Sequence, residues 1–431
     1  MTETMKDSGQ EWIGAIPESW DTNRIRYCLD EINVKNSPVK TEQILSLVKD
    51  KGVMLYEEKG DVGNKAKEDI TGYKVAFPNT LIVNSMNILI GSVGISQYKG
   101  CVSPVYYVFR EKDNSDLRFI NYIFNTREFQ KELRKYANGI LEIRLRVSAT
   151  DIFNRKMPLP SKEEQIEIAD FLDEKCAEID RLSEDIQKQI DILEEYKKSV
   201  ITRAVTKGLN PNAEMKDSGI DWIGQIPKDW EVLRIKNLGT ARNGLTYSPN
   251  DLAAEEDGTL VLRSSNVKDG KINLEDNVYV SCKIPSNLMV KKGDILICSR
   301  NGSRELIGKN AIIDDIYATY GAFMMVYRSI DPEYLYYILN SEIFSYYLGT
   351  FFTSTINQLT GQNFNNMKIV FCPDKNERVK IVEYLKEKTS DIDDSIRIKK
   401  QQLDNLNTYK KSIIYEYVTG KKRVKGALWN H

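Results

Sequence analysis

Residues 5–25 read MKDSGQEWIGAIPESWDTNRI, and residues 215–235 read MKDSGIDWIGQIPKDWEVLRI. The two copies keep the same spacing throughout, with Trp12 over Trp222 and Trp20 over Trp230. A repeat of roughly half the chain is far longer than the ~20–50 residues of solenoid repeats, so it indicates a duplicated domain pair. Because Trp and Ile at this spacing are mostly buried, we interpret each copy as an arm packed on a neighbouring surface rather than as a ligand contact.

The composition is that of a globular protein of 431 residues, which predicts about two to four domains. We expect no signal peptide and no membrane partner, because no apolar run opens the chain or approaches the ~20 residues of a membrane span. The six cysteines form no close pairs, which predicts buried free thiols in a reducing compartment, hence a cytoplasmic protein. The only histidine is His431, which excludes histidine-based metal sites and catalysis, and we expect no metal and no cofactor.

The charge is unevenly distributed along the chain. The net charge is −1, but residues 162–195 hold thirteen acidic and four basic residues. The remainder of the chain is therefore mildly basic. Mild basicity is compatible with DNA binding and does not demonstrate it.

A long helix is predicted to begin after Ser161, which forms a capping-box pattern with Glu164. No Pro or Gly interrupts the chain until Gly208. Apolar residues recur every seven positions, which is typical of a coiled coil of about five heptads. The first row is Leu172, Ile179, Ile186, Leu193 and Val200, and we place a second row at Cys176, Leu182, Ile190, Tyr196 and Ala204.

A second long helix follows Pro373, with its row at Leu385, Ile392, Lys399, Leu406 and Ile413. The two helices superpose at a constant shift, which brings Tyr196-Lys-Lys-Ser over Tyr409-Lys-Lys-Ser. The matching rows predict that the helices pack antiparallel. Lys399 either fixes the register of the pair as a polar seam residue or extends its amine to solvent, and the sequence does not favour one.

Short apolar runs separated by Gly and Pro turns fill the two remaining segments, and each segment ends in a helical pattern, 117–135 and 332–348. The fold class is therefore α+β, with two pseudo-symmetric globular domains separated by two long antiparallel coiled-coil helices. The predicted domains are 1–158 (arm and globular domain), 159–209 (helix), 210–372 (second arm and globular domain) and 373–431 (second helix and tail).

This arrangement resembles the DNA-specificity subunit of type I restriction-modification systems, over essentially the whole chain. The resemblance is carried by the duplicated arm, by the segment Pro158 to Leu172 (PLPSKEEQIEIADFL) and by the duplicated Tyr-Lys-Lys-Ser. The second helix departs from the pattern, because Pro373-Asp-Lys-Asn-Glu-Arg replaces Pro-x-x-Glu-Gln. This departure weakens the expectation that both helix starts make identical partner contacts.

The resemblance implies a non-catalytic subunit in which each globular domain, a target recognition domain, reads one half of a split target in double-stranded DNA. The helices would fix the spacing and dock two modification (methyltransferase) subunits, with restriction (translocase/nuclease) subunits joining them. The helix pair carries more aromatic residues than one seam can bury, and exposed apolar patches mark interfaces. The residues expected to contact partners are Phe171, Tyr196, Tyr384 and Tyr409.

Base readout requires polar and basic side chains presented to base edges, with further contacts to phosphates. In the first globular segment the candidates are Asn84, Ser85, Asn87, Gln97, Tyr98, Lys99, Arg144 and Arg146. In the second they are Arg263, Ser264, Asn266, Arg300, Asn301, Ser303, Arg304, Lys309, Gln358, Gln362 and Asn363. For any single residue, an ordinary solvated loop explains the sequence equally well.

Two other classes of protein remain as alternatives. One is a DNA methyltransferase or nuclease with divergent motifs, although no Asn-Pro-Pro-Tyr, Asp-Pro-Pro-Tyr or phosphate-binding Gly-x-x-x-x-Gly-Lys-Ser/Thr motif is present. The other is a coiled-coil scaffold that does not bind DNA, which the salt dependence of duplex binding would distinguish.

Overall fold

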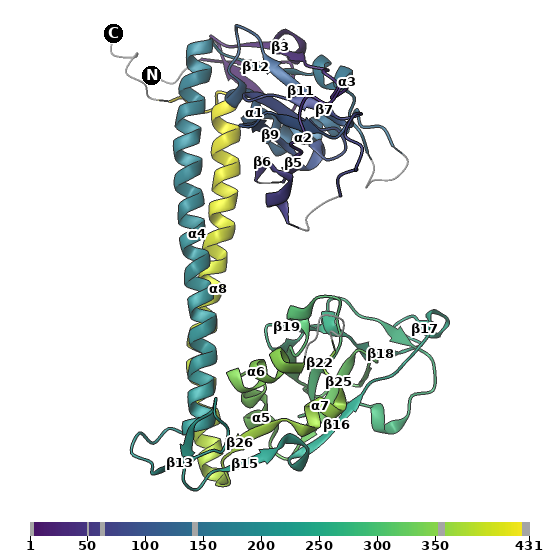
Figure 1. Cartoon of the computed structure of the whole chain (residues 1–431), viewed down its shortest axis with the longest axis vertical. Coiled ribbons are helices and arrows are strands. Elements are labelled where there is room, and N and C mark those ends of the chain that lie inside the picture. The colour runs from purple at the N-terminus through teal and green to yellow at the C-terminus, as the bar shows by residue number, and fades with distance from the viewer. Residues whose placement is uncertain (1–3, 50, 61–64, 140–144, 352–357, 425–431) are drawn as a thin grey trace. The chain divides into compact units, whose positions relative to one another are not determined.

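The computed structural model describes residues 4–49, 51–60, 65–139, 145–351 and 358–424 (Figure 1). The chain forms two compact units. The first combines Met1–Ile186 with Gln401–His431, and the second is Gln187–Lys400. Each unit contains one arm, one mixed α/β domain and a stretch of both long helices, which confirms the predicted fold class of two similar α+β domains and an antiparallel helix pair.

The first unit contains most of the N-terminal half of the chain. Its strands are β1 (Met5–Asp7), β2 (Ala15–Pro17), β3 (Asp21–Arg24), β4 (Leu29–Glu31), β5 (Leu45–Val48), β6 (Gly52–Leu55), β7 (Lys74–Ala76), β8 (Thr80–Asn84), β9 (Val93–Ser96), β10 (Gly100–Val102), β11 (Tyr106–Glu111) and β12 (Lys156–Leu159). Its shorter helices are α1 (Leu117–Phe124), α2 (Arg127–Arg134) and α3 (Ala149–Asn154). The long helix α4 (Lys162–Lys207) begins in this unit and ends in the second.

The second unit follows a similar order of elements and contains additional strands. Its strands are β13 (Met215–Asp217), β14 (Gln225–Pro227), β15 (Glu231–Arg234), β16 (Gly239–Asn243), β17 (Leu252–Ala253), β18 (Thr259–Leu262), β19 (Val267–Lys268), β20 (Lys271–Ile272), β21 (Tyr279–Val280), β22 (Ile295–Cys298), β23 (Asn310–Ile312), β24 (Ala318–Tyr320), β25 (Met324–Ser329) and β26 (Lys368–Phe371). Its helices are α5 (Pro332–Ile338), α6 (Glu342–Phe351) and α7 (Gly361–Asn366), and α8 (Lys375–Val418) begins here and ends in the first unit.

The main sheets of the two units have the same topology. The first unit has the strand order β4-β11-β8-β9 and the second has β16-β25-β22-β23, with antiparallel neighbours in both. The second unit adds the sheet β17-β21-β18-β24, in which β18 and β24 are parallel. The duplication that the arms indicated therefore extends through the globular domains.

Each arm is anchored by a buried tryptophan, as expected. Trp20 and Trp230 are at most 2% exposed. The indole nitrogen of Trp20 donates to Glu164 Oε2 at 2.9 Å, and that of Trp230 donates to Glu377 Oε2 at 3.3 Å. Both glutamates lie in the first turn of a long helix, so each arm fixes the start of one helix.

The long helices pack antiparallel within each unit, as predicted. In the first unit, Lys410 Nζ of α8 bonds Asp180 of α4 at 2.6 Å. In the second, Lys197 of α4 bonds Asp393 of α8 at the same distance. Lys399 reaches Gln189 Oε1. Both long helices are too polar to cross a membrane, and the other helices among the described residues are too short.

The second predicted apolar row of α4 is wrong at two positions. Leu182 and Tyr196 are 47% and 55% exposed, whereas Ser183 and Lys197 are partly buried. The second row is therefore Cys176, Ser183, Ile190, Lys197 and Ala204, with regular heptad spacing. Ser183 fits because its hydroxyl bonds Ile179 O at 2.8 Å, and Lys197 fits because Asp393 neutralises it.

Each single helix expected in the globular segments is a pair. Thr126 ends the first helix and caps α2, since its hydroxyl accepts a hydrogen bond from Phe129 N. Residues 339–341 separate α5 from α6 in the same way. The apolar spacing continues across both breaks, and this continuity hid them in the sequence.

The departure at the second helix start is accommodated by a change of bonding partner. Gln165 of α4 accepts a hydrogen bond from Asp116 N at 2.9 Å, and Arg378 of α8 instead bonds Asp331 Oδ2 at 2.7 Å. Asp116 and Asp331 are the N-caps of the equivalent helices α1 and α5. Each of the two side chains also donates to two backbone carbonyls, so both helix starts are tied to their domains.

Candidate nucleic-acid interface

One hydrogen bond recurs at the end of the central strand in both domains. Val147 N donates to Ser85 O at 3.1 Å in the first unit, and Leu359 N donates to Ser299 O at 2.8 Å in the second. Ser85 follows β8 and Ser299 follows β22, while Val147 and Leu359 each precede the N-cap residue of α3 or α7. We call each bonded pair a strand-end clamp.

The clamps present different side chains in the two domains. In the first, exposed Arg146 lies next to Val147, with its Nη2 3.7 Å from the sulfur of Met86. In the second, exposed Arg300 follows Ser299 and forms an isolated bridge with Gln358. Each clamp therefore carries one arginine. In the first domain it lies in the segment before α3, and in the second it lies in the segment after β22.

The other candidates of the first domain differ in burial and position. Asn84 and Ser85 are buried, and Asn84 Oδ1 accepts a hydrogen bond from Met86 N at 3.1 Å, which ties the turn. Asn87 is exposed in the same loop. Arg144 lies outside the described residues.

Gln97, Tyr98 and Lys99 form an exposed turn. This turn lies at the far end of β9 from the clamp, because β9 runs antiparallel to β8 with Val83 opposite Val93 and Thr80 opposite Ser96. The structure therefore does not bring this turn together with Arg146.

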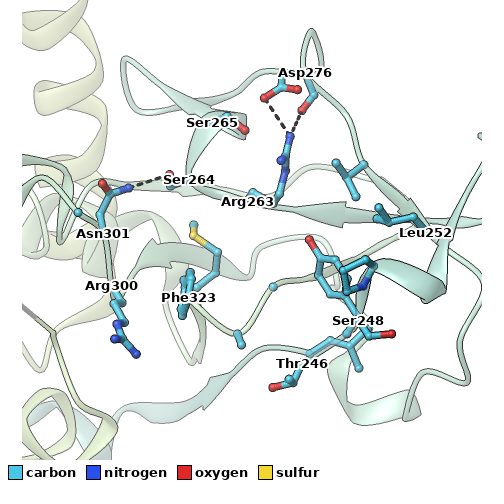
Figure 2. A pocket seen from close by; sticks show the side chains of 18 residues that line it. Thr246, Ser248, Leu252, Arg263, Ser264, Ser265, Asp276, Arg300, Asn301 and Phe323 are labelled. Atoms are coloured by element: carbon cyan, nitrogen blue, oxygen red, sulfur yellow. Dashed lines mark hydrogen bonds and ion pairs between the residues drawn. The ribbon is translucent and has the colours of Figure 1, made fainter.

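In the second domain, strand ends from two sheets line an open cavity of about 1240 Å³. The ends of β16, β18, β22 and β24 and the start of β25 meet at one edge, because Cys298 pairs with Met324 and Leu262 pairs with Tyr320. Its lining includes Thr246, Tyr247, Arg263, Ser264, Ser265, Asp276, Arg300, Asn301 and Phe323 (Figure 2).

Several walls of this cavity are held by side-chain bonds (Figure 2). Arg263 pairs with Asp276 Oδ2 at 2.9 Å and also bonds its carbonyl. Asn301 Nδ2 donates to Ser264 Oγ at 3.0 Å. Arg263 Nε and Ser265 Oγ are buried and have no hydrogen-bond partner among the described residues.

Arg300 differs from Arg263 in its surroundings. Its guanidinium lies 5.2 Å from the ring centroid of Phe323, which is 58% exposed. Among the described residues no carboxylate pairs with it. The arginine backbone is fixed, because Arg300 N donates to Phe323 O at 3.1 Å.

Two buried titratable groups lie at strand ends behind the cavity lining. Burial raises the pKa of the Cys298 thiol, and burial together with Asp294 raises the pKa of Tyr320 to about 12. Both side chains therefore stay uncharged near neutral pH. The formal charges of the lining are those of Arg263, Asp276 and Arg300, so Arg300 leaves the cavity with a net positive charge.

The remaining candidates of the second domain differ in exposure. Asn266 is fully buried, and its amide bonds the carbonyls of Asn273 and Asp276, so it is committed to the loop. The amine of half-buried Lys309 bonds Val267 O at 3.0 Å. Ser303, Arg304 and Gln362 are exposed, and Asn363 is half-buried.

Sequence reasoning missed the exposed Phe323 and the polar residues Thr246 and Tyr247 that line the cavity. One glycine beside the cavity, Gly244, is a signal that could have indicated it. A Cβ at Gly244 would lie 2.2 Å from Tyr320 O, so the backbones of β16 and β24 approach closely there. Glycine within a strand-rich pattern is typical of such approaches.

The residues expected to contact protein partners lie mainly on the surface. Tyr196 and Tyr409, which are equivalent in the two helices, are 55% and 52% exposed, and Tyr384 is 36% exposed. Phe171 is half-buried because Tyr417 covers it, with ring centroids 4.5 Å apart. Tyr196 and Ile192 line a groove between α4 and the start of α6.

Comparison with known proteins gives consistent matches over most of the chain. The type I restriction enzyme MjaVIII specificity subunit of Methanocaldococcus jannaschii is 28% identical over 433 residues, covering 95% of this chain and 94% of that protein. The putative MjaX specificity subunit of the same organism is 25% identical over 440 residues, covering 96% of each chain.

A solved chain described as "Structural basis underlying complex assembly and conformational transition of the type I R-M system" has a similar fold. Its TM-score is 0.68 at 14% identity, covering 94% of this chain and 99% of that one. The family model for the type I restriction modification DNA specificity domain matches residues 28–191 and 227–408, one stretch for each repeat. The chain therefore belongs to the family of type I restriction modification DNA specificity domains.

Proposed function

We propose that this protein is the DNA-binding specificity subunit of a type I restriction-modification complex. Each globular domain reads one half of a bipartite target in double-stranded DNA, and the paired helices fix the spacing between the halves. The protein itself is non-catalytic and acts through modification and restriction subunits.

The strand-end clamp is the observation that carries this proposal. The same hydrogen bond, at the same place in two domains, presents different polar side chains to solvent. A shared scaffold with different exposed side chains is the arrangement expected of two domains that read different sequences, because base-edge contacts depend on side-chain identity and phosphate contacts do not.

The proposed docking surface for modification subunits is the exposed aromatic face of the helices. Tyr196 and Tyr409 occupy equivalent positions and stay exposed although each lies in a helix that buries its other face. Exposed tyrosines of this kind are enriched in protein interfaces. Two equivalent tyrosines support two modification subunits for each specificity subunit.

The decisive experiment combines the full chain with its modification subunits and maps methylation on duplexes that carry a randomised segment. We expect a target of two specified parts with an unspecified gap. Replacing residues 26–158 with the segment of a relative should change one part only. Methylation without a sequence preference, or a change in both parts, would contradict the proposal.

Enzymatic activity of the chain alone is tested separately. The isolated protein with S-adenosylmethionine and target duplex is expected to transfer no methyl group. Duplex binding should weaken steeply with salt, as counterions are released from the phosphates. Binding that is absent at low salt would instead favour a scaffold that does not contact DNA.

A further inference from the structure

We propose that Arg300 reads a guanine in the half-site recognised by the second domain, with Phe323 as the platform that positions its guanidinium. This inference rests on the proposed function and names the residue that determines one base of the target. It is carried by the contrast between two arginines that line the same cavity.

The first step is the difference in pairing. Arg263 is neutralised by Asp276 at 2.9 Å, so its charge is already used within the protein. No carboxylate among the described residues pairs with Arg300. An arginine that reads a base needs its two parallel N–H donors free, and of these two residues Arg300 meets that condition.

The second step is preorganisation. Arg300 N donates to Phe323 O at 3.1 Å, and Ser299 N and Oγ both donate to the same carbonyl at 3.0 Å. The bridge to Gln358 holds the other side of the segment. The ring of Phe323 lies 5.2 Å from the guanidinium, within range of a cation–π contact. Less side-chain freedom is then lost on binding.

The third step is the chemistry of the ligand. Arginine donating to guanine O6 and N7 is the commonest base-specific contact in the major groove. A cavity of about 1240 Å³ exceeds the ~300–1,000 Å³ typical of small-molecule pockets, and it suits the edge of a larger ligand. The exposed face of Phe323 adds an apolar surface of the kind that contacts bases.

The test measures binding of the full chain, in complex with its modification subunits, to the target found for the wild type and to duplexes substituted one base pair at a time. For Arg300→Ala, discrimination at a single G·C pair of one half-site should fall by about 5- to 150-fold, the range expected for one bidentate contact. Specificity in the other half-site should not change.

Two further variants make the result specific. Arg300→Lys keeps the charge and loses the fork, so it should lose the same discrimination while keeping the salt dependence of wild type. Phe323→Leu keeps an apolar side chain and removes the ring face, so it should lose part of the discrimination at the same base pair. Arg234→Ala, at an exposed arginine outside the cavity, controls for charge removal.

Four outcomes decide between explanations. Loss of discrimination at one G·C pair supports the proposal. Weaker binding to all duplexes, with a salt slope smaller by about one, would identify a phosphate contact and overturn it. Unchanged specificity would overturn it as well. If the wild-type complex shows no sequence preference at all, the proposed function fails, and this result is distinct from the other two.

Discussion

At the residue scale, the structure distinguishes polar side chains that are exposed to solvent from those that are buried and hydrogen-bonded within their own loop. The sequence predicts Asn84 and Asn266 as base contacts on the same grounds as Arg300. Both asparagines are buried and bonded within their own loops. A loop sequence carries no sign of which amide is satisfied internally, because that depends on the loop path. The exposure of Arg300 after β22 agrees with the sequence pattern, and its contact with a base stays a prediction.

The arm contact allows a prediction at a single glycine. Gly420 has φ +70°, and a Cβ there would lie 2.4 Å from Pro17 Cδ and 3.0 Å from Trp20 Cζ3. Gly14 has the same φ and nothing within 4 Å. Gly14→Ala should cost only the left-handed strain of about 1–2 kcal/mol. Gly420→Ala should cost a further ~1–3 kcal/mol, because rigid atoms must move.

Urea unfolding of the two variants, followed by tryptophan fluorescence, measures this difference. The free energies of unfolding should be compared for the transition that exposes Trp20, since two units need not unfold together. Equal decreases in the free energy of unfolding for both variants would contradict the prediction. They would show that the arm can move away from position 420 at no measurable cost.

At the element scale, the heptad pattern predicted the long helices and one of the two rows, and failed where polar residues lie in the seam. The pattern predicts Leu182 and Tyr196 in the second row because their side chains are largely apolar. Ser183 and Lys197 occupy it because a neighbouring carbonyl and a carboxylate satisfy them. Periodicity detects apolar side chains and cannot detect a polar one whose partner is on the other helix.

The equivalent ion pairs give a prediction for these elements. Lys197–Asp393 and Lys410–Asp180 are both 2.6 Å long, with lysines 28% and 29% exposed. Double-mutant cycles to alanine should give coupling energies of about 0.3–1 kcal/mol for each pair, with similar values because the environments match. The coupling should shrink in 1 M salt. A coupling that is large for one pair and absent for the other would contradict the equivalence.

The exposed face of α4 gives a second prediction. Tyr196→Ala should weaken association with the modification subunit by about tenfold or more, as expected for an interface tyrosine. The free energy of unfolding should change by less than about 0.5 kcal/mol, because the ring is exposed. Tyr317→Ala, at a tyrosine that is 78% exposed on the globular domain, is the matched control. Titration calorimetry or sedimentation measures the association, and equal effects of both variants would contradict docking at α4.

At the scale of the whole molecule, the duplication could be predicted almost completely from sequence, and the composition of each unit could not. The arms, the helix repeats and the strand-rich segments gave the order of elements. That the first unit is assembled from two distant parts of the chain, residues 1–186 and 401–431, follows from packing. Ile413 and Val418 lie in its core, and Tyr415 Oη donates to Trp12 O at 3.0 Å.

This discontinuity sets an order of events during synthesis on the ribosome. The second unit is one continuous segment, so all of its residues are available once residue 400 has emerged. Residues 1–186 of the first unit are translated earlier, yet their core stays incomplete until residues 401–418 of α8 follow. Domains otherwise tend to fold in the order of their synthesis. Here the first unit completes its fold last, and its apolar core residues stay exposed until then.

A chain that ends at Lys400 lacks the C-terminal part of the first unit, so it allows the stability of the incomplete unit to be measured. Limited proteolysis should cut residues 1–186 rapidly and leave 187–400 protected, whereas a chain that ends at Val424 should resist in both parts. Protection of both parts in the shorter chain would show that the first unit folds without its C-terminal segment. If only the second part is protected, a chain whose synthesis stops soon after residue 400 has a complete second unit and a first unit that is exposed to proteases.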